Sequence, residues 1–415
     1  MSRVIALCFL LLASVLAYLH IDSRPPWVPF ASTYPVDSAN HVEGATELTE
    51  SSRPAKSLKN TAPVNLAQPT LQMGWLPDTG VPSVHAASLI ALKDGAVRAF
   101  WFAGSREGAP DVVINTSVYD PRATQWSAPT VVMDRVSAER GLARYIAKLG
   151  NPVPARMADG RIQLFFVTVS IGGWAGSSIS SVISDDEGLT WGQPQRLISS
   201  PLINLSTLVK SPAIFFSDGR LGLPSYHEWI GRFGEFLRID ASQVIDKRRM
   251  SSGRSAIQPV VFTDGPQEAS AFFRQTRSSS QPKQIPVSET KDAGQSWVVI
   301  QDLEIPNPNS AVAALTLANG SRLLVLNNIE AGRYRLVMVM RESNSTQWEV
   351  IQVLEDDESL GNDQRREFSY PYLISANGED AHLAYTWDRK KIRHVYFSAA
   401  WFKHVLSGLK EKEVQ

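Results

Sequence analysis

The sequence predicts an all-β fold: a six-bladed β-propeller that follows an N-terminal apolar segment. Asp-Gly or Asn-Gly dipeptides recur between pairs of apolar runs, at intervals of roughly 45 to 65 residues. Two further segments, residues 184–191 and 290–297, share one turn pattern that ends in Trp. Each interval has room for four short strands, and six such units fit a ring of sheets around a central channel.

The dipeptides mark one β-hairpin in each unit. Asn-Gly and Asp-Gly are the pairs that tight hairpin turns prefer, because their central positions need a left-handed backbone. The six pairs are Asp94-Gly95, Asp159-Gly160, Asp218-Gly219, Asp264-Gly265, Asn319-Gly320 and Asn377-Gly378. One hairpin in each unit therefore predicts six blades.

The two longer turns support the same repeat. They read S-x-D-x-G-x-T-W at 184–191 and T-x-D-x-G-x-S-W at 290–297. The Asp can accept hydrogen bonds from the N–H groups of its own turn, and the Gly supplies a left-handed conformation. The Trp covers the base of the hairpin with a large apolar area. Two copies of one such turn indicate a repeated β unit.

The first 21 residues predict export. An uninterrupted apolar run at 4–19 follows Arg3, as in an export segment. Its length fits either a cleaved signal peptide or a membrane anchor, for which about 20 residues is typical. The rest of the chain is then expected in the periplasm or outside the cell, anchored to the inner membrane if the segment 1–21 is not cleaved. Cys8, the only cysteine, lies in this run, so the exported domain carries no disulfide.

The remaining chain divides into three parts. Residues 22–70 are rich in Pro and Ser and lack periodicity, which predicts a linker. The propeller is expected over residues 71–400, with its first segment supplying the outer strand that closes the ring against the last blade. The apolar spacing of residues 401–415 predicts a short helix with a charged tail.

Charge and motif content exclude several classes of function. Lys+Arg and Asp+Glu number 41 each, so no net field attracts nucleic acid or an anionic membrane surface. The sequence has no clustered His and Cys spacing typical of zinc sites. It also has no phosphate-binding glycine loop and no G-x-S-x-G elbow. We therefore expect no metal, no cofactor and no nucleic-acid partner, and the oligomeric state stays open.

Polar residues stand just before the first apolar run of each unit. That run is the innermost strand of a blade, so these residues are expected to meet at one mouth of the channel. They are His85, Asn151, Lys210, Ser211, Gln258, Asn307, Asn309 and Tyr370. The ends of the following strands add a second layer, formed by Glu107, Asp111, Tyr226, His227, Glu228, Arg274, Arg333, Trp387 and Arg389.

With these motifs the chain resembles the sialidase (neuraminidase) superfamily and its bacterial BNR-repeat relatives, over about residues 75–400. The resemblance implies that Arg274 and Arg333 are two of three arginines that bind a substrate carboxylate. Planar guanidinium groups suit that role because they bind carboxylates with two parallel hydrogen bonds. The resemblance also implies Tyr370 as the nucleophile, with Glu107 or Asp111 as the acid/base residue; Glu107 is preferred, because Asp111 opens the next strand.

Two positions depart from the family pattern. His85 stands where the first arginine is expected, and Gln258 stands where a glutamate that assists the tyrosine is expected. A glutamine can hydrogen-bond a tyrosine hydroxyl but cannot take its proton. Glu228 or His227 can substitute for the missing glutamate from the neighbouring blade.

Three functions remain open at this stage. The first is an exported, exo-acting glycoside hydrolase that cleaves a terminal acidic sugar, sialic acid or a related one, with Tyr370 attacking the anomeric carbon. The second is a polysaccharide lyase, in which Tyr226 with His227, or His85, removes the proton next to a uronate carboxylate. The third is a glycan-binding propeller without catalysis. The residues expected to contact the acidic glycan are Arg274, Arg333, His85, Gln258, Asn151, Asn309 and Tyr226.

Overall fold

The computed structural model of the chain describes residues 8–9, 11–16, 68–200, 203–240, 242–277 and 283–413. The chain separates into two compact units, residues 1–60 and 61–415, and the described residues of the first unit are helical. Nowhere in the described ranges does a helix combine the length and the apolar character needed to cross a bilayer. Most of the predicted export segment, and residues 22–67 of the predicted linker, lie outside the described residues.

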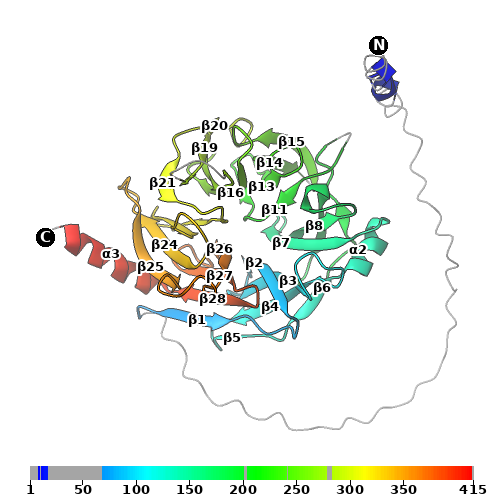
Figure 1. Cartoon of the computed structure of the whole chain (residues 1–415). Coiled ribbons are helices and arrows are strands. Elements are labelled where there is room, and N and C mark those ends of the chain that lie inside the picture. The colour runs from blue at the N-terminus through cyan, green and yellow to red at the C-terminus, as the bar shows by residue number, and fades with distance from the viewer. Residues whose placement is uncertain are drawn as a thin grey trace, which may run out of the picture. The chain divides into compact units, whose positions relative to one another are not determined.

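The second unit is a six-bladed β-propeller, which confirms the predicted fold (Figure 1). Blade 1 consists of β2 (Ser83–Ala91), β3 (Val97–Gly104), β4 (Val113–Asp120), β5 (Gln125–Trp126) and β6 (Thr130–Met133). Blade 2 consists of β7 (Lys148–Arg156), β8 (Ile162–Val169), β9 (Ser177–Ser184) and β10 (Gln195–Arg196). Blade 3 consists of β11 (Leu208–Val209), β12 (Ile214–Phe215), β13 (Leu221–His227), β14 (Phe233–Asp240) and β15 (Gln243–Arg249).

The second half of the ring repeats this plan. Blade 4 consists of β16 (Ala256–Thr263), β17 (Ala269–Gln275), β19 (Val287–Thr290) and β20 (Val298–Val299). Blade 5 consists of β22 (Ala313–Thr316), β23 (Arg322–Leu326), β24 (Arg335–Arg341) and β25 (Glu349–Asp356). Blade 6 consists of β26 (Phe368–Ile374), β27 (Ala381–Trp387), β28 (Lys391–Phe397) and β1 (Leu71–Trp75). The other elements are β18 (Gln284–Ile285) paired with β21 (Leu303–Pro306), the helices α2 (Arg135–Leu142) and α3 (Ala399–Glu413), and the 3-10 turn η1 (Trp174–Gly176).

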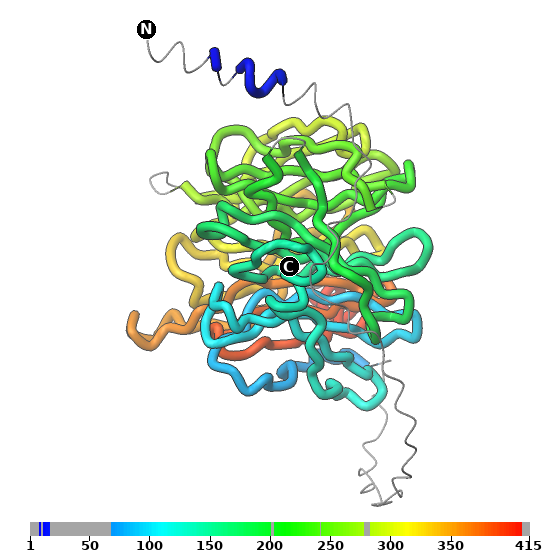
Figure 2. The backbone as a smooth tube through the Cα atoms, turned by 90° about the vertical axis from the view of Figure 1, so that its right-hand side faces the viewer, coloured from blue at the N-terminus to red at the C-terminus, as the bar shows by residue number. Residues whose placement is uncertain are grey.

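The first strand of the propeller closes the ring. β1 pairs antiparallel with β28, in a register that runs from Leu71 opposite Phe397 to Trp75 opposite Arg393. It is therefore the outermost strand of blade 6, and the blue and red ends of the propeller lie side by side in both views (Figure 1, Figure 2). The strands at the start and end of the domain thus belong to one sheet.

The two Trp-ended turns have the hydrogen bonds that their residue types predict. In the first, Asp186 accepts from the backbone N–H of Thr190 at 2.9 Å and from its hydroxyl at 2.5 Å. The hydroxyl of Ser184 accepts from the N–H of Gly188 at 2.8 Å, and Gly188 has a φ of 87°. These hydrogen bonds lower the pKa of Asp186 to about 2, and the one from the Thr190 hydroxyl contributes most. Asp186 therefore stays ionised and keeps its hydrogen bonds. Trp191 packs edge to face on Phe100, 5.7 Å between ring centroids.

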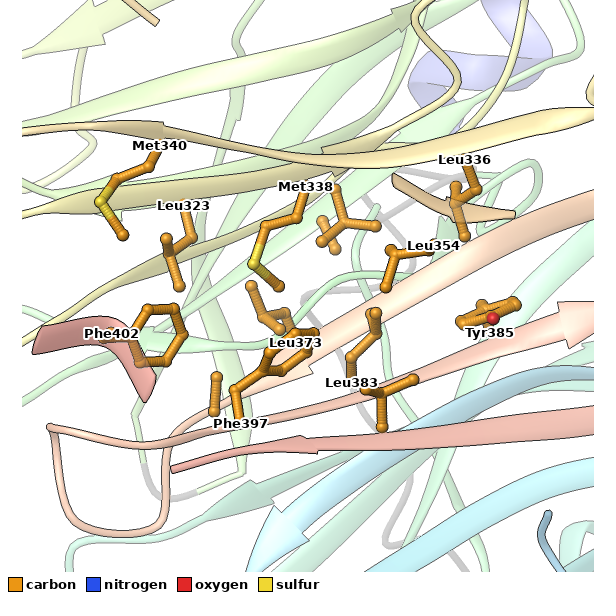
Figure 3. Packing of buried hydrophobic residues seen from close by; sticks show 14 of the residues in the cluster. Leu323, Leu336, Met338, Met340, Leu354, Leu373, Leu383, Tyr385, Phe397 and Phe402 are labelled. Atoms are coloured by element: carbon orange, nitrogen blue, oxygen red, sulfur yellow. The ribbon is translucent and has the colours of Figure 1, made fainter. Parts of the chain in front are cut away.

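Apolar side chains fill the space between blades. Between blades 5 and 6, Leu323, Met338, Leu373 and Phe397 are buried against one another, and Phe402 of helix α3 joins them (Figure 3). Helix α3 is therefore attached to the ring through its apolar face. The alternation of inward and outward residues along each strand puts these groups on opposing sheet faces.

A buried histidine pair lies between the two final strands of blade 6. His382 of β27 and His394 of β28 stack with their rings 10° from parallel, and Nδ1 of the first is 3.1 Å from Nε2 of the second. Burial lowers the pKa of both rings, and the proximity of His382 lowers that of His394 further. Both are therefore neutral in the folded protein near pH 7.

The histidine pair predicts a loss of stability in acid. Below pH 6.5 the unfolded chain binds protons on these histidines while the folded chain does not, so the free energy of unfolding decreases as pH falls. We expect His394→Gln to reduce this loss by up to about 2 kcal/mol between pH 7.5 and pH 5. Guanidinium unfolding of wild type and variant at both values measures the difference. Equal losses in the two proteins would contradict this origin of acid sensitivity.

Candidate functional site

Four innermost strands carry a β-bulge near the end where they begin. In each bulge one residue has a left-handed backbone: Ala86, Asn151, Gln258 and Tyr370 have φ values of 52°, 45°, 50° and 54°. The strand register shifts at the same places. A bulge re-aims the side chain that it carries. Because this conformation is disfavoured by about 1–2 kcal/mol for residues other than Gly, the fold holds strain where these side chains converge.

The Gln258 amide joins two tyrosines and an arginine. Its Nε2 donates to the Tyr226 hydroxyl at 3.2 Å and to the Tyr370 hydroxyl at 3.0 Å. Its Oε1 accepts from Nη1 of Arg274 at 3.2 Å. A guanidinium can only donate, so the amide oxygen must face Arg274 and the amide NH₂ must face the hydroxyls. Asn151 donates to the Tyr226 hydroxyl at 3.4 Å. The structure therefore brings together Asn151, Tyr226, Gln258, Arg274 and Tyr370.

Three arginines form a second part of the same network. The Asn309 side chain accepts from Nε of Arg274 at 2.7 Å, and its backbone carbonyl accepts from Nη2 of Arg333 at 3.0 Å. Arg333 also donates to Oε1 of Glu367 at 3.0 Å. Nε of Arg389 donates to Oε2 of the same carboxylate at 3.2 Å. Asn309 and Glu367 thus hold the three guanidinium groups in fixed orientations.

Glu367 remains ionised across the physiological range. Burial opposes its ionisation, but a 2.6 Å hydrogen bond from Ser369 and the charges of Arg333 and Arg389 outweigh burial. Together they lower the pKa of Glu367 to about 2. The arginines that it pairs with are therefore held in the same way at every pH at which the protein is expected to work.

His85 faces this network as a neutral ring. It is buried and lies 4.3 Å from the Tyr370 ring, centroid to centroid. Neither ring nitrogen has a hydrogen-bond partner within the described part of the chain. Burial, with a further contribution from the charge of Arg389, lowers the pKa of His85 to about 3. His85 therefore cannot replace the missing first arginine as a cation, but it can accept a hydrogen bond or a proton.

Lys210 lies beside the network and joins three blades. Lys210 directly follows β11 of blade 3. Its buried Nζ donates to the carbonyl of Val312 at 3.1 Å and to that of Pro371 at 2.5 Å. Val312 directly precedes β22 of blade 5, and Pro371 directly follows Tyr370 in β26. Burial, and then the charge of Arg274, lowers the pKa of Lys210 to about 7. One amine thus supports the backbone that carries Tyr370.

Two of the predicted carboxylates lie at this site. Glu107 forms an ion pair with Arg389 and so borders the arginine cluster. Glu228 follows β13 and is partly buried. Burial raises the pKa of Glu228, while the charge of Arg274 acts in the opposite direction. The charge of Glu228 also contributes to the raised pKa of Tyr226, where burial is the main cause. Glu228 is thus electrostatically linked to both groups.

Asp111 and His227, the other two residues predicted as an acid or a base, are held by local contacts. Asp111 accepts from the backbone N–H of Ser105 at 2.9 Å and from its hydroxyl at 3.0 Å. His227 stacks on Phe233, 4.7 Å between ring centroids, and its Nε2 accepts from the N–H of Ile230 at 3.2 Å. Among the described residues, no hydrogen bond or ion pair links Asp111 or His227 to the three arginines. Their catalytic roles remain predictions.

Cavity volume alone favours a different position for the binding site. A groove of about 940 Å³ lies between blades 4 and 5 and is lined by residues that include Phe272, Arg341 and Trp348. None of the network residues described above lines this groove. A binding site is better indicated by convergent polar groups with perturbed pKa values than by volume. We therefore place the candidate site at the mouth of the channel.

The sequence matches the family model of the BNR repeat-like domain over residues 95–383. The chain belongs to this family. No curated protein matches the sequence. The BNR-repeat relationship predicted from the turn motifs is therefore confirmed.

Solved sialidases have the same fold as this BNR repeat-like protein. The Hadza microbial sialidase Hz136 is 14% identical with a TM-score of 0.61, and the match covers 75% of this chain and 65% of that chain. Trypanosoma rangeli sialidase in complex with the inhibitor DANA is 13% identical with a TM-score of 0.61, covering 80% and 58%. NanB sialidase from Streptococcus pneumoniae is 12% identical with a TM-score of 0.60, covering 82% and 71%. The chain thus spans less than two thirds of the first two sialidases, and at these identities the likeness shows the fold.

The sequence of this BNR repeat-like protein did not identify Glu367 as a site residue, and it placed Arg389 in the second layer without a role. Glu367 lies three residues before Tyr370, just ahead of an innermost strand. Arg389 lies in the turn after β27 and has a φ of 53°. The ion pair between Glu367 and Arg389, at 3.2 Å, identifies both as residues of the site. A charged residue just upstream of Tyr370 was the signal that could have pointed to Glu367.

Proposed function

We propose that this protein is an exported, sialidase-like glycoside hydrolase that removes a terminal carboxylated sugar. The observation that supports this best is the Gln258 amide, which binds the Tyr370 hydroxyl and the Arg274 guanidinium at once. A nucleophile for the anomeric carbon thereby stands beside a cation for the sugar carboxylate. Trypanosoma rangeli sialidase, which has the same fold, binds sialic acid and the inhibitor DANA.

In this mechanism the Tyr370 oxygen attacks the anomeric carbon and configuration is retained. A neutral phenol is suited to this step because an anionic nucleophile would be repelled by the substrate carboxylate. Arg274 and Arg333 bind that carboxylate, and Arg389 lies next to them. Glu107 pairs with Arg389, so a substrate carboxylate that takes over contacts of Arg389 would weaken the pair. Glu107, released from that pair, would then be free to act as the acid toward the leaving-group oxygen.

The proton of Tyr370 needs an acceptor other than Gln258, whose NH₂ faces the hydroxyl. Glu228 is the carboxylate that we propose for this role. Tyr226 shares the Gln258 amide with Tyr370 and is electrostatically linked to Glu228. In the proposed mechanism the Tyr226 hydroxyl relays the proton from Tyr370 to Glu228.

We expect Glu228→Gln to lower kcat by about 10²-fold, because a general base typically contributes this much. Glu228 must be deprotonated to accept a proton, so wild-type activity should fall as pH falls through its raised pKa. The variant should lose that acidic limb of the pH–rate profile. His227→Gln is the matched control and should keep both rate and limb. An unchanged acidic limb in Glu228→Gln would assign the base to another residue.

The proposed function is tested with fluorogenic α-glycosides of sialic acid and of related carboxylated sugars. Release of the fluorophore, with retention of configuration by proton NMR, is the expected result. No release from any acidic glycoside, together with measurable binding in calorimetry, would instead favour a glycan-binding propeller.

A second candidate reaction, elimination from a uronate, is favoured by one observation. His85 is neutral, has no hydrogen-bond partner on either ring nitrogen within the described residues, and contacts Tyr370. Such a ring can remove a proton next to a carboxylate that arginines neutralise. A product that absorbs in the ultraviolet as a conjugated uronate would identify this reaction. If acidic glycosides are cleaved and no such product forms, elimination is excluded.

A further inference from the structure

An aromatic side chain of blade 2 lies against the backbone of the candidate site. A methyl group added at Gly150 would come within 2.8 Å of the Trp174 ring, so the ring lies directly against Gly150 and a larger residue there would require a shift. The same methyl would lie 3.7 Å from Phe102, whose ring packs on His85 at 5.6 Å between centroids. Gly150 directly precedes Asn151, which donates to Tyr226. Trp174 is therefore separated from the network by a single strand backbone.

Lys148 lies between Trp174 and the loop of the proposed acid. Its Nζ is 6.0 Å from the centroid of the Trp174 ring. Its Cδ lies 3.4 Å from the position of a methyl added at Gly108, the residue after Glu107. Within the described residues no hydrogen bond or ion pair occupies its ammonium group. Lys148 thus offers three donors beside Gly108, the residue after Glu107.

The surrounding loops expose apolar groups on the same side of blades 2 and 3. Ile171, in the loop that leads to Trp174, is 83% exposed, and Trp229, next to Glu228, is 55% exposed. The hydroxyl of Ser170 donates to the carbonyl of Tyr145 at 2.6 Å and so fixes the base of the first loop. Exposed apolar side chains therefore stand in the loop of Trp174 and next to Glu228.

We propose that Trp174 and Lys148 form a second subsite, which binds the sugar on the leaving-group side of the cleaved bond. The inference rests on the proposed function, in which Glu107 protonates the leaving-group oxygen and so marks that side. A flat indole packs against the carbon-bound hydrogens of a sugar ring, and the Lys148 ammonium donates to its hydroxyls. The expected occupant is an uncharged hexose, as the next residue of a glycan that ends in the acidic sugar.

The test compares two substrates with the same acidic sugar: its methyl glycoside, which lacks a second ring, and a trisaccharide in which it is linked to lactose. We expect Trp174→Ala to lower kcat/KM for the trisaccharide about tenfold, as an aromatic contact of roughly 1 kcal/mol or more would give. The methyl glycoside should be cleaved at the wild-type rate. Since Trp174 also packs on the core of blade 2, Lys148→Gln serves as a second variant that leaves packing intact and should show the same selective loss.

The other outcomes test the subsite and the proposed function separately. Equal losses on both substrates, or no loss on either in both variants, would overturn the subsite while leaving the hydrolase intact. If the wild-type protein cleaves neither substrate, the proposed function fails. Binding of the trisaccharide to wild type and Lys148→Gln by calorimetry then decides the subsite separately. Equal dissociation constants would overturn it, and weaker binding by the variant would support it.

Discussion

Tyr370→Phe is expected to lower kcat by on the order of 10³-fold on any acidic glycoside that the wild-type protein cleaves, because the substitution removes the proposed nucleophile. Phe retains the ring that packs on His85 and loses only the hydroxyl that Gln258 binds at 3.0 Å. The fold and the affinity for substrate should therefore be preserved. Single-turnover rates, with unfolding midpoints measured in parallel, separate the chemical step from any loss of structure.

Tyr226→Phe is the matched control for this experiment. Tyr226 is buried and accepts from the same Gln258 amide, at 3.2 Å, so both variants remove one hydroxyl from one donor. We expect a clearly smaller loss of kcat, because Tyr226 relays a proton and does not attack the sugar. A larger loss in Tyr226→Phe than in Tyr370→Phe would transfer the role of nucleophile to Tyr226.

Arg274→Ala is expected to raise KM for the acidic glycoside by about 10²-fold, since hydrogen bonds to charged groups contribute about 1.5–3 kcal/mol each. Loss of this guanidinium also frees Gln258 and Asn309, which it holds at 3.2 Å and 2.7 Å. The effect should be confined to substrates with a carboxylate. Comparison of the acidic glycoside with its methyl ester, in wild type and variant, isolates the charge-dependent part.

Two further variants test whether the effect on KM is specific to the Arg274 guanidinium. Arg274→Lys keeps the charge but not the planar fork, so an intermediate KM is expected. Arg277→Ala removes a neighbouring arginine whose side chain, among the described residues, pairs with Asp302 at 3.6 Å and donates to the hydroxyl of Ser255. That variant should behave as wild type. An Arg274→Ala protein with unchanged KM on both substrates would remove Arg274 from carboxylate binding.

The convergence of Gln258, Tyr370 and Asn151 could be foreseen from the sequence. Each stands at the start of an innermost strand, and the hairpin spacing already required those strands to surround one channel. Their backbone conformation could not be foreseen. Each precedes a proline, which normally favours an extended backbone, yet all three have positive φ. Here the bulges of the assembled ring override a local preference.

The arginine network shows a second limit of sequence reasoning. Arg274 and Arg333 were found because the family resemblance assigns arginines to the strands that carry them. Glu367 was missed because its partners lie 34 and 22 residues away along the chain, in two different blades. No local pattern distinguishes such a carboxylate from a solvated one. Only the closed ring brings the three groups together.

The pairing of β1 with β28 affects how the protein can be made. Residues 71–75 have no sheet to join until residues 391–397 have been synthesised, so the first-made strand of the domain must wait for the last. Contacts this distant in sequence form late in folding. A nascent or truncated chain that ends before β28 would leave the edges of blade 6 unpaired and open to association with other chains. The ring can therefore close only after translation has passed β28.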